Sequence, residues 1–168
     1  MDKESILNGD MNLLFESERC CVRHFINADI DDFLLYRNNP KWMKFQGFKG
    51  LLREEYEEIL LKEPLVESGA QFAVISRADH SLVGDIFIKK VTDTFGIGYT
   101  VSPLVKRQGY AYEIANSMIL WIKQQGEYKI KAGVALENKS SIRLLEKLGF
   151  LQLAEENGEL IYLLPQDK

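Results

Sequence analysis

The stretch Val101–Ala115, which reads VSPLVKRQGYAYEIA, carries the strongest signal for the fold. It begins at the end of an apolar strand, breaks at Pro103 and crosses a basic turn that contains Gly109. From Tyr110 onward the apolar residues recur at helical spacing. The first N–H groups of a helix have no partner within the helix and carry about half a positive charge, so a strand, a glycine turn and a helix in this order can hold a phosphate.

The turn alone does not establish such a site. Many glycine turns precede helices that bind nothing, so a purely structural role stays open at this point. The glycine spacing is that of neither a Walker loop nor a dinucleotide fingerprint. Whether the turn binds a phosphate therefore depends on the motifs in the rest of the chain.

Length and composition describe an ordinary globular chain. Its 168 residues are enough for one domain with a proper core, and 46% hydrophobic and 27% charged residues are typical values. The net charge of −4 argues against a nucleic-acid backbone as partner, since that partner requires a basic face. No apolar run approaches the length of a membrane span, and residues 1–15 do not read as a signal peptide. We therefore expect neither a nucleic acid nor a membrane as partner.

The cysteines and histidines predict no cross-link and no metal. Cys20 and Cys21 are adjacent, and neighbours on a strand point to opposite faces, so a disulfide between them would be strained. A reduced, cytoplasmic protein is the simplest interpretation. His24 and His80 are isolated and show no metal-ligand spacing.

Strands and helices alternate along most of the chain. Residues 1–17 show no clear period and are expected to form a loose arm or a short helix, followed by one domain over residues 18–168. Period and turn signals predict strands at Arg19–Phe25, Gln71–Ser76, Leu82–Val91, Ile97–Val101, Ile130–Leu136, Phe150–Ala154 and Leu160–Leu164. Helices are predicted from Asn27, as N-cap, to Arg37, over Leu52–Lys62, from Tyr110 to about Gln124, and from Asn138 to Leu148.

This order predicts a single α/β (α+β) domain with one central sheet. Short links make most strands antiparallel, and we expect about six to seven strands and about four helices. The strand at Ile130 follows a helical crossover, so it should run parallel to the strand ending at Val101. Such a parallel pair is where a sheet of this kind can open to admit a ligand.

Four stretches together carry a family resemblance. They are Ile97–Pro103 (IGYTVSP), Lys106–Ala111 (KRQGYA), Glu137–Ser141 with Glu146–Phe150 (ENKSS and EKLGF), and Asp31–Arg37 with Phe45–Gly47 (DDFLLYR and FQG). In these stretches the chain resembles a GNAT-superfamily N-acetyltransferase, and more narrowly the branch of ribosomal-protein N-terminal (alanine/serine) acetyltransferases. The resemblance covers most of Arg19–Leu164 in the order of the family.

The resemblance implies a strongly bent sheet with a splayed parallel strand pair, acetyl-coenzyme A (acetyl-CoA) as cofactor and a primary amine as acceptor. It also implies that backbone amides of the turn hold the pyrophosphate, and that the pantetheine arm lies along the backbone of Tyr99–Val101. The implied cofactor-binding residues are Thr100, Val101, Lys106, Arg107, Gln108, Gly109, Tyr110, Ala111, Asn138 and Ser141. The family has Gln or Arg where this chain has Lys106.

The proton donor is the second departure from the family pattern. Many members carry a tyrosine near the thiol in the last helix, and the matching position here is Leu145. Ser141 is then the nearest hydroxyl of the motif, with bulk water as the alternative. Tyr99 either lines the acyl site or packs with a solvated hydroxyl. Asp85 or Glu137 acts as a base through water, or is simply solvated.

The missing strong base favours an α-amine as acceptor. At neutral pH a lysine-type amine, with a pKa of about 10.4, costs roughly 4–5 kcal/mol to deprotonate, whereas an α-amine with a pKa of about 7.8 costs about 1 kcal/mol. The aromatic stretch Trp42–Phe48 either packs over the core or forms a wall of the acceptor site, for which Trp42, Phe45 and Gln46 are the candidates. The acidic helix at Leu52–Lys62 is either a solvated face or an attractant for a cationic amine.

Several hypotheses about function therefore stand side by side. The leading one is a cytoplasmic acetyl-CoA-dependent N-acetyltransferase that acts on a peptide or protein N-terminus. Alternatives are acetylation of a small cationic amine, such as an antibiotic or polyamine, and a noncatalytic acyl-CoA sensor, which Leu145 keeps open. A nucleotide-binding α/β module fits the motif at Asn138–Phe150 less well. The resemblance also leaves a homodimer possible.

Overall fold

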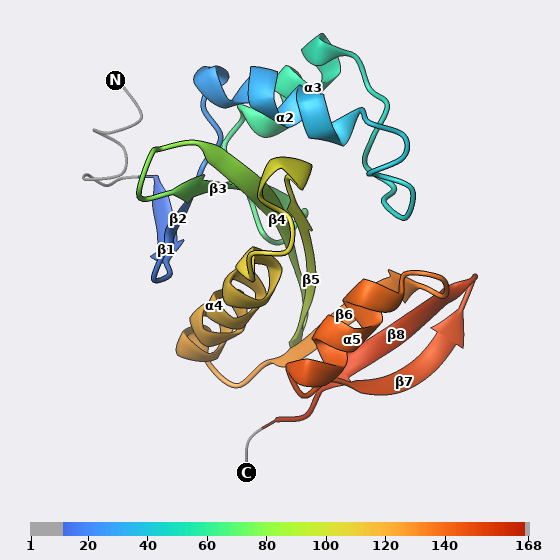
Figure 1. The fold of residues 1–168 in the computed structure, drawn as a ribbon. Coiled ribbons are helices and arrows are strands. Elements are labelled where there is room, and N and C mark those ends of the chain that lie inside the picture. Colours follow the sequence, from blue (N-terminus) through green and yellow to red (C-terminus); the bar gives the residue numbers. More distant parts are fainter. Residues whose placement is uncertain (1–11, 167–168) are drawn as a thin grey trace.

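One mixed sheet organises the computed structural model, which describes residues 12–166. Its strand order is β1-β2-β3-β4-β5-β6-β8-β7 (Figure 1). The strands are β1 (Leu13–Glu16), β2 (Cys20–Arg23), β3 (Ala70–Ser76), β4 (Leu82–Val91), β5 (Thr94–Val101), β6 (Lys129–Ala135), β7 (Leu151–Glu156) and β8 (Glu159–Leu164). The helices are α2 (Ile30–Arg37), α3 (Arg53–Leu60), α4 (Tyr110–Gln125) and α5 (Lys139–Lys147), with short 3-10 turns at η1 (Asn27–Asp29) and η2 (Pro103–Val105).

The topology confirms the predicted mixed α/β domain. Every neighbouring pair of strands is antiparallel except β5 and β6, which are parallel as the helical crossover of α4 requires. The hairpin of β7 and β8 turns at Asn157-Gly158, where both residues have positive φ, as a tight Asn-Gly turn demands. The sheet has eight strands among the described residues, which is more than the expected six to seven.

The additional strand comes from the expected N-terminal arm. Residues 13–16 form β1, which pairs antiparallel with β2, so the expectation of a loose arm or short helix is wrong there. This segment reads LLFE and is only four residues long, which is too short to show a strand period. Residues 1–11 of the expected arm lie outside the described residues.

The start of the first helix is the second correction. Asn27 is exposed and belongs to η1, and α2 begins only at Ile30. The carboxylate that accepts a hydrogen bond at this chain entry belongs to Asp29, whose Oδ2 lies 2.9 Å from the Ile26 amide nitrogen. Asp29 also forms a buried ion pair with Arg23, at 2.8 Å between Nη1 and Oδ2. Because Arg23 pairs with Asp29, it is Asp29 and not Asn27 that fixes the start of the helix.

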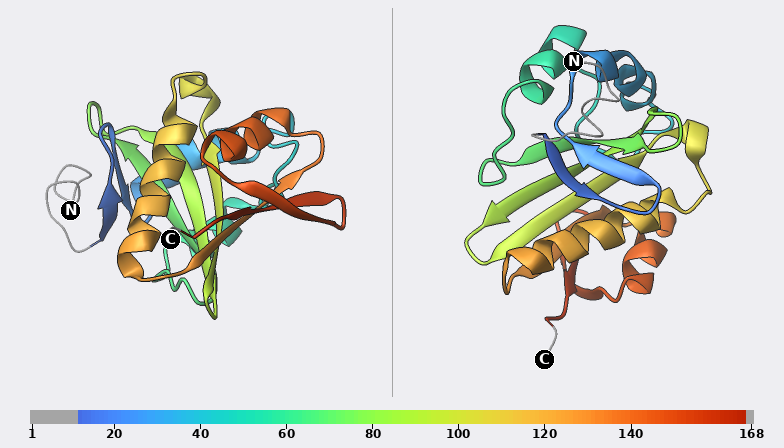
Figure 2. Two further views of the ribbon diagram at one scale, coloured as in Figure 1. Left: turned by 90° about the horizontal axis from the view of Figure 1, so that it is seen from below. Right: turned by 90° about the vertical axis from the view of Figure 1, so that its left-hand side faces the viewer.

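The sheet separates two apolar cores. Alternate residues of β3 show the division: Phe72 and Val74 pack on the side of α4, and Ala73 and Ile75 pack on the side of α2 and α3. In Figure 1 the two N-terminal helices lie above β3 and β4, while α4 lies below them. The further views in Figure 2 show the same arrangement. Since β3 is buried on both faces, the middle of the sheet is a rigid platform.

Glu113 fixes the start of α4 against the first hairpin. Its carboxylate accepts hydrogen bonds from the Ser17 hydroxyl at 2.5 Å, and from the Arg19 amide and Nε at 2.8 and 2.6 Å. Burial raises the pKa of Glu113, but these hydrogen bonds outweigh burial and lower it. The N-terminal turn of α4 is thereby held in place.

Two smaller findings complete the fold. Cys20 and Cys21 are both buried free thiols. Between residues 12 and 166, no helix combines the length and the apolar character needed to cross a bilayer.

Candidate active site

The turn between β5 and α4 has the backbone geometry that an anion site requires. Ser102 caps η2 by accepting a hydrogen bond from the Leu104 amide at 3.3 Å, and the chain then turns through positive φ at Arg107 and Gly109. No side chain caps the N-terminus of α4, so its first amides keep their donors for a ligand. A Cβ at Gly109 would meet no atom closer than 3.6 Å, so crowding does not require glycine here. Glycine instead permits the φ of 81° and leaves the backbone open to a ligand.

A groove of about 730 Å³ runs from this turn across the end of β5 to the start of α5. The structure brings nearly all predicted cofactor-binding residues to it: Thr100, Val101, Lys106, Arg107, Gly109, Tyr110, Ala111, Asn138 and Ser141 line the groove. Gln108 is exposed and does not line it. Trp42, Phe45 and Gln46, predicted for the acceptor, also line this groove. We call it the cofactor groove.

Strands β5 and β6 separate beside the cofactor groove. They pair only from Thr94–Gly96 to Lys129–Lys131, although β5 continues to Val101 and β6 to Ala135. Figure 1 shows β6, β8 and β7 swinging away from β5 beyond this short contact. A cavity of about 140 Å³ fills the gap. The gap leaves one backbone edge of β5 without a strand partner, which is an edge that an extended ligand can pair with.

The end of β5 is drawn towards β4 on its other side. The Thr100 carbonyl approaches Gly84 so closely that a Cβ there would lie 2.1 Å from the oxygen. Only glycine permits this contact. The close contact between β4 and β5 therefore accompanies the opening between β5 and β6.

Ser141 and Tyr99 face each other across this site. The Asn138 side chain caps α5 by accepting a hydrogen bond from the Ser141 amide at 3.4 Å, so the motif fixes the place of Ser141. The Tyr99 hydroxyl is buried and has no hydrogen-bond partner among residues 12–166. Burial raises the pKa of Tyr99 to about 12, although the nearby Ser141 side chain lowers it slightly. The tyrosine is therefore protonated at neutral pH and keeps a proton that it can donate.

A second cavity of about 510 Å³ shares wall residues with the cofactor groove. Gln46, Tyr99 and Thr100 line both spaces, and we call these shared residues the junction. Asp85 lies at this second cavity, but it is buried and ion-paired: the Arg37 Nη2 lies 2.6 and 2.5 Å from its two carboxylate oxygens. We call this space the acceptor pocket.

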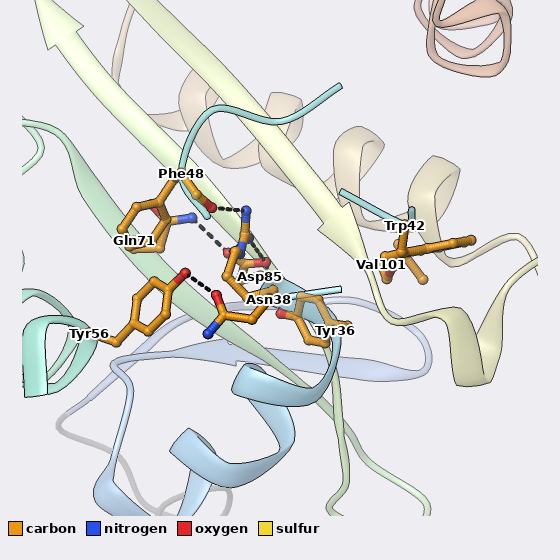
Figure 3. A network of polar contacts seen from close by, with 9 residues as sticks. Tyr36, Asn38, Trp42, Phe48, Tyr56, Gln71, Asp85 and Val101 are labelled. Carbon is orange, nitrogen blue, oxygen red and sulfur yellow. Dashed lines mark hydrogen bonds and ion pairs between the residues drawn. The ribbon is translucent and has the colours of Figure 1, made fainter. Parts of the chain in front are cut away.

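Asp85 is the centre of a polar network that joins three elements (Figure 3). It accepts further hydrogen bonds from the Tyr36 hydroxyl at 2.9 Å and from the Gln71 Nε2 at 2.7 Å. Burial, more than the neighbouring carboxylate, raises the pKa of Tyr36 well above its usual value, so this hydroxyl stays a donor. A carboxylate with all these partners is poorly placed to accept a proton from a substrate. Glu137, the other carboxylate considered as a base, is exposed and lines none of these three cavities.

The same network fixes the aromatic loop. Arg37 donates from Nη1 to the Phe48 carbonyl at 3.0 Å, and the Trp42 indole donates to the Val101 carbonyl at 2.9 Å. Phe48 packs edge to face on Tyr56, with 5.3 Å between the ring centroids. Phe48 of the loop packs over the core, as one of the two expectations had it, whereas Trp42 and Phe45 line the cofactor groove.

The acceptor pocket contains residues that sequence reasoning missed. The helical spacing of Ile59 with Tyr56 and Leu60 predicts an inward side chain, yet Ile59 is 40% exposed and lines this pocket. The pairing of Arg37 with Asp85 was also missed, although both charges interrupt apolar stretches and that interruption was the available signal. Among residues 12–166, no group of three or more potential metal ligands gathers.

Known proteins resemble this chain over most of its length. A family model described as "Acetyltransferase (GNAT) domain" matches residues 19–151. Among curated proteins, the Bacillus subtilis protein named "Uncharacterized N-acetyltransferase YjdG" is 26% identical over 120 residues, which cover 69% of this chain and 70% of that protein.

Solved structures share the fold. An acetyltransferase (GNAT family) from Bacillus anthracis matches with a TM-score of 0.78 at 23% identity, covering 92% of this chain and 98% of its own. Ribosomal-protein-S5-alanine acetyltransferase from Vibrio fischeri matches with a TM-score of 0.72 at 22% identity, covering 92% and 96%. Spermidine N-acetyltransferase from Vibrio cholerae, in complex with CoA and spermine, matches with a TM-score of 0.72 at 17% identity, covering 86% and 93%. At these identities the matches establish the common architecture and leave the acceptor open.

Proposed function

The chain belongs to the GNAT acetyltransferase family, and from this membership we propose that it transfers an acetyl group from acetyl-CoA to the α-amine of a peptide or protein N-terminus. Acetyl transfer is the activity of the family; the acceptor is the part that we add. The observation that carries the proposal is the cofactor groove, in which an uncapped helix N-terminus and an unpaired strand edge meet.

The residues of the groove fit the parts of acetyl-CoA. The amides of Arg107 through Ala111 and the charge of Lys106 suit its pyrophosphate, because helix N-termini and basic side chains both favour anions. The edge of β5 at Tyr99–Val101 has no strand partner, although the Trp42 indole donates to the Val101 carbonyl, and it suits the amide-containing pantetheine arm. Asn138 and Ser141 border the same path. When bound, acetyl-CoA supplies the activated thioester.

We assign Tyr99 as the proton donor to the departing sulfur. Ser141 is the neighbouring hydroxyl that passes a proton to Tyr99, and we call the two residues the relay. The Tyr99 hydroxyl is buried and protonated at neutral pH, and the residue lines both cavities. Tyr99 would replace the tyrosine that many family members carry at the position of Leu145. A positioned acid of this kind contributes roughly 10²–10⁴-fold to a reaction rate.

In place of its expected role as a base, we assign Asp85 a positioning role. Its ion pair with Arg37 holds the loop that carries Gln46 and Phe48 over the acceptor pocket. The amine then loses its proton to water, which suits an α-amine with its pKa of about 7.8 better than a lysine-type amine. This cost supports the α-amine over a small cationic amine.

The first test is calorimetric titration of the protein with acetyl-CoA, coenzyme A and a dinucleotide as control. We expect micromolar binding of the two coenzyme A forms alone, because the groove offers a pantetheine path that a dinucleotide does not use. A screen of acceptors that follows thiol release comes next. Equal binding of the dinucleotide contradicts the proposal, and coenzyme A binding without turnover on any amine favours the noncatalytic sensor.

The proposal includes a cytoplasmic protein. The two free, buried cysteines support a reducing compartment. The proposed assembly is a homodimer, and sedimentation velocity measures the oligomeric state directly.

A further inference from the structure

The walls of the acceptor pocket are apolar. The apolar side chains that line it come from the aromatic loop, from the end of α3 with the segment behind it, and from β4. They are Phe48, Ile59, Leu60, Pro64, Leu65 and Phe87. Three of them remain substantially exposed, namely Ile59 at 40%, Leu65 at 58% and Phe87 at 37%. Apolar surface of this kind, open to solvent at a site, is surface that a ligand can cover.

The charges that line the acceptor pocket cancel. Arg37 and Asp85 are buried and paired with each other. Lys62 and Glu63 have opposite signs and are exposed. The acidic side chains of α3 do not line this pocket, the cofactor groove or the gap beside β6; these are Glu54, Glu55, Glu57 and Glu58. Among the described residues, the pocket therefore has no buried, unpaired carboxylate with which a polycation could pair.

Polar groups interrupt the apolar wall at a few points. Gln46 and Ser68 bring an amide and a hydroxyl to the acceptor pocket, and Gln71 adds its amide oxygen, since its Nε2 donates to Asp85. Groups of this kind pair with the backbone of a peptide, whereas a simple aliphatic amine leaves them without partners. Gln46 lies at the junction with the cofactor groove, which is where the reacting amine must be held.

We propose that the acceptor pocket binds the first residue of a peptide or protein N-terminus and selects an uncharged, apolar side chain there. This inference rests on the proposed function and specifies its acceptor. Burying a charged side chain against apolar walls is unfavourable, and burying an apolar one removes its surface from water. The acetylated amine is the one attached to this residue, so the side chain and the α-amine enter together.

A matched panel of acceptors tests the inference. Peptides of one length that differ only in a first residue of Leu, Ser or Lys are compared with spermidine and with isoamylamine, a free amine with the same branched chain. We expect kcat/KM for the Leu peptide to exceed that for the Lys peptide and spermidine by tenfold or more. Preference for the Lys peptide or spermidine overturns the apolar selection, and an equal rate with isoamylamine overturns the peptide as the occupant.

Two neighbouring residues provide a matched pair of variants. Ile59 lines the acceptor pocket and is 40% exposed, whereas Leu61 is 39% exposed and does not line it. We expect Ile59→Glu to lower kcat/KM for the Leu peptide about tenfold and to improve the relative rate with the Lys peptide. Leu61→Glu should change neither. Equal effects of the two substitutions contradict the placement of the acceptor in this pocket.

Binding measurements separate this inference from the proposed function. Titration of coenzyme A should give the same affinity for the wild type, Ile59→Glu and Leu61→Glu, since neither residue lines the cofactor groove. Titration of the N-acetylated Leu peptide without coenzyme A should show weaker binding to Ile59→Glu alone. If coenzyme A fails to bind, the proposed function fails, and the peptide titration still decides whether the pocket selects the apolar residue.

Discussion

The cofactor groove and the acceptor pocket share Tyr99, yet backbone groups form the first and side chains form the second. The groove depends on backbone geometry: an uncapped helix N-terminus, positive φ at Gly109 and an unpaired strand edge. The pocket depends on side chains that come from α2, α3, β3 and β4, and its floor is the ion pair of Arg37 and Asp85. The groove should therefore tolerate most side-chain substitutions, and the pocket should not.

The molecule contains a natural control for that ion pair. Arg23 and Asp29 form a second buried pair, at 2.8 Å, which anchors the entry to α2 and does not line the groove or the pocket. The two pairs share their chemistry and their burial. They differ in what they hold in place, so comparing them separates stability from function.

The largest expected effect comes from breaking the pocket. Asp85→Asn leaves the Arg37 charge buried without a counter-charge, which should cost about 3–5 kcal/mol of unfolding free energy. Asp29→Asn should cost a similar amount for the same reason. Denaturant unfolding measures both, and kinetics on the folded fraction should show a raised acceptor KM for Asp85→Asn alone. An unchanged acceptor KM in Asp85→Asn would contradict its positioning role.

The next effect comes from breaking the groove. Gly109→Asp places a negative side chain at the turn, and coenzyme A affinity should fall by about 100-fold or more, measured by calorimetry. Gly109→Asn has the same positive-φ strain without the charge and should bind more tightly than the aspartate variant. Arg19, whose Nη2 lies 3.6 Å from the added Cβ, offsets part of the charge. Equal affinity of Gly109→Asp and wild type would remove the turn from the phosphate site.

Tyr99→Phe tests the junction itself. Turnover should fall by about 10²-fold with little change in coenzyme A affinity, because the variant loses a proton donor and keeps the ring. Removing a buried, unpartnered hydroxyl should leave the unfolding free energy unchanged or raise it by about 1 kcal/mol. Loss of stability together with activity would identify the residue as a packing element.

The pH dependence of stability provides an independent measurement on Tyr99. Its folded pKa of about 12 lies above its usual value of 10, so the folded protein holds the proton more tightly than the unfolded chain. The stabilising contribution is present below pH 10 and is lost as pH rises through about 12. Thermal unfolding of Tyr99→Phe should show a shallower decline over that window.

The smallest effect is expected for Ser141→Ala. Ser141 is the neighbour of Tyr99 in the relay, so turnover should fall about tenfold or less, with coenzyme A affinity nearly unchanged. Stopped assays of thiol release measure the rate, and Tyr99→Phe is the reference. Turnover equal to that of the wild type would remove Ser141 from the mechanism.

The difference between groove and pocket is also a difference in what could be predicted. The strand, turn and helix at Val101–Ala115 and the Asn138 motif are contiguous patterns, and the structure brings nearly all of their predicted residues to one groove. The parallel contact of β5 and β6 followed from chain order alone. Gln108 was assigned to the site and lies outside it, since a turn exposes some of its side chains to solvent.

The pocket could not be predicted in the same way. Asp85 appeared as a candidate base because its strand position was visible, but its partners Arg37, Tyr36 and Gln71 lie 14 to 49 residues away. The exposure of Ile59 likewise depends on what α3 packs against. Even β1 became a strand only because β2 offers it an edge.

By itself, the sequence determined most of the elements, their order, the parallel crossover and the turn that we propose binds phosphate. These follow from hydrophobic period, turn chemistry and the unpaired amides of a helix start, all of which act within a few neighbouring residues. The tertiary structure decided that Asp85 is paired, that Tyr99 has a free buried hydroxyl at the junction, and that apolar side chains line the acceptor pocket. Partner choice and burial are set by contacts between distant segments, and only the folded chain specifies those contacts.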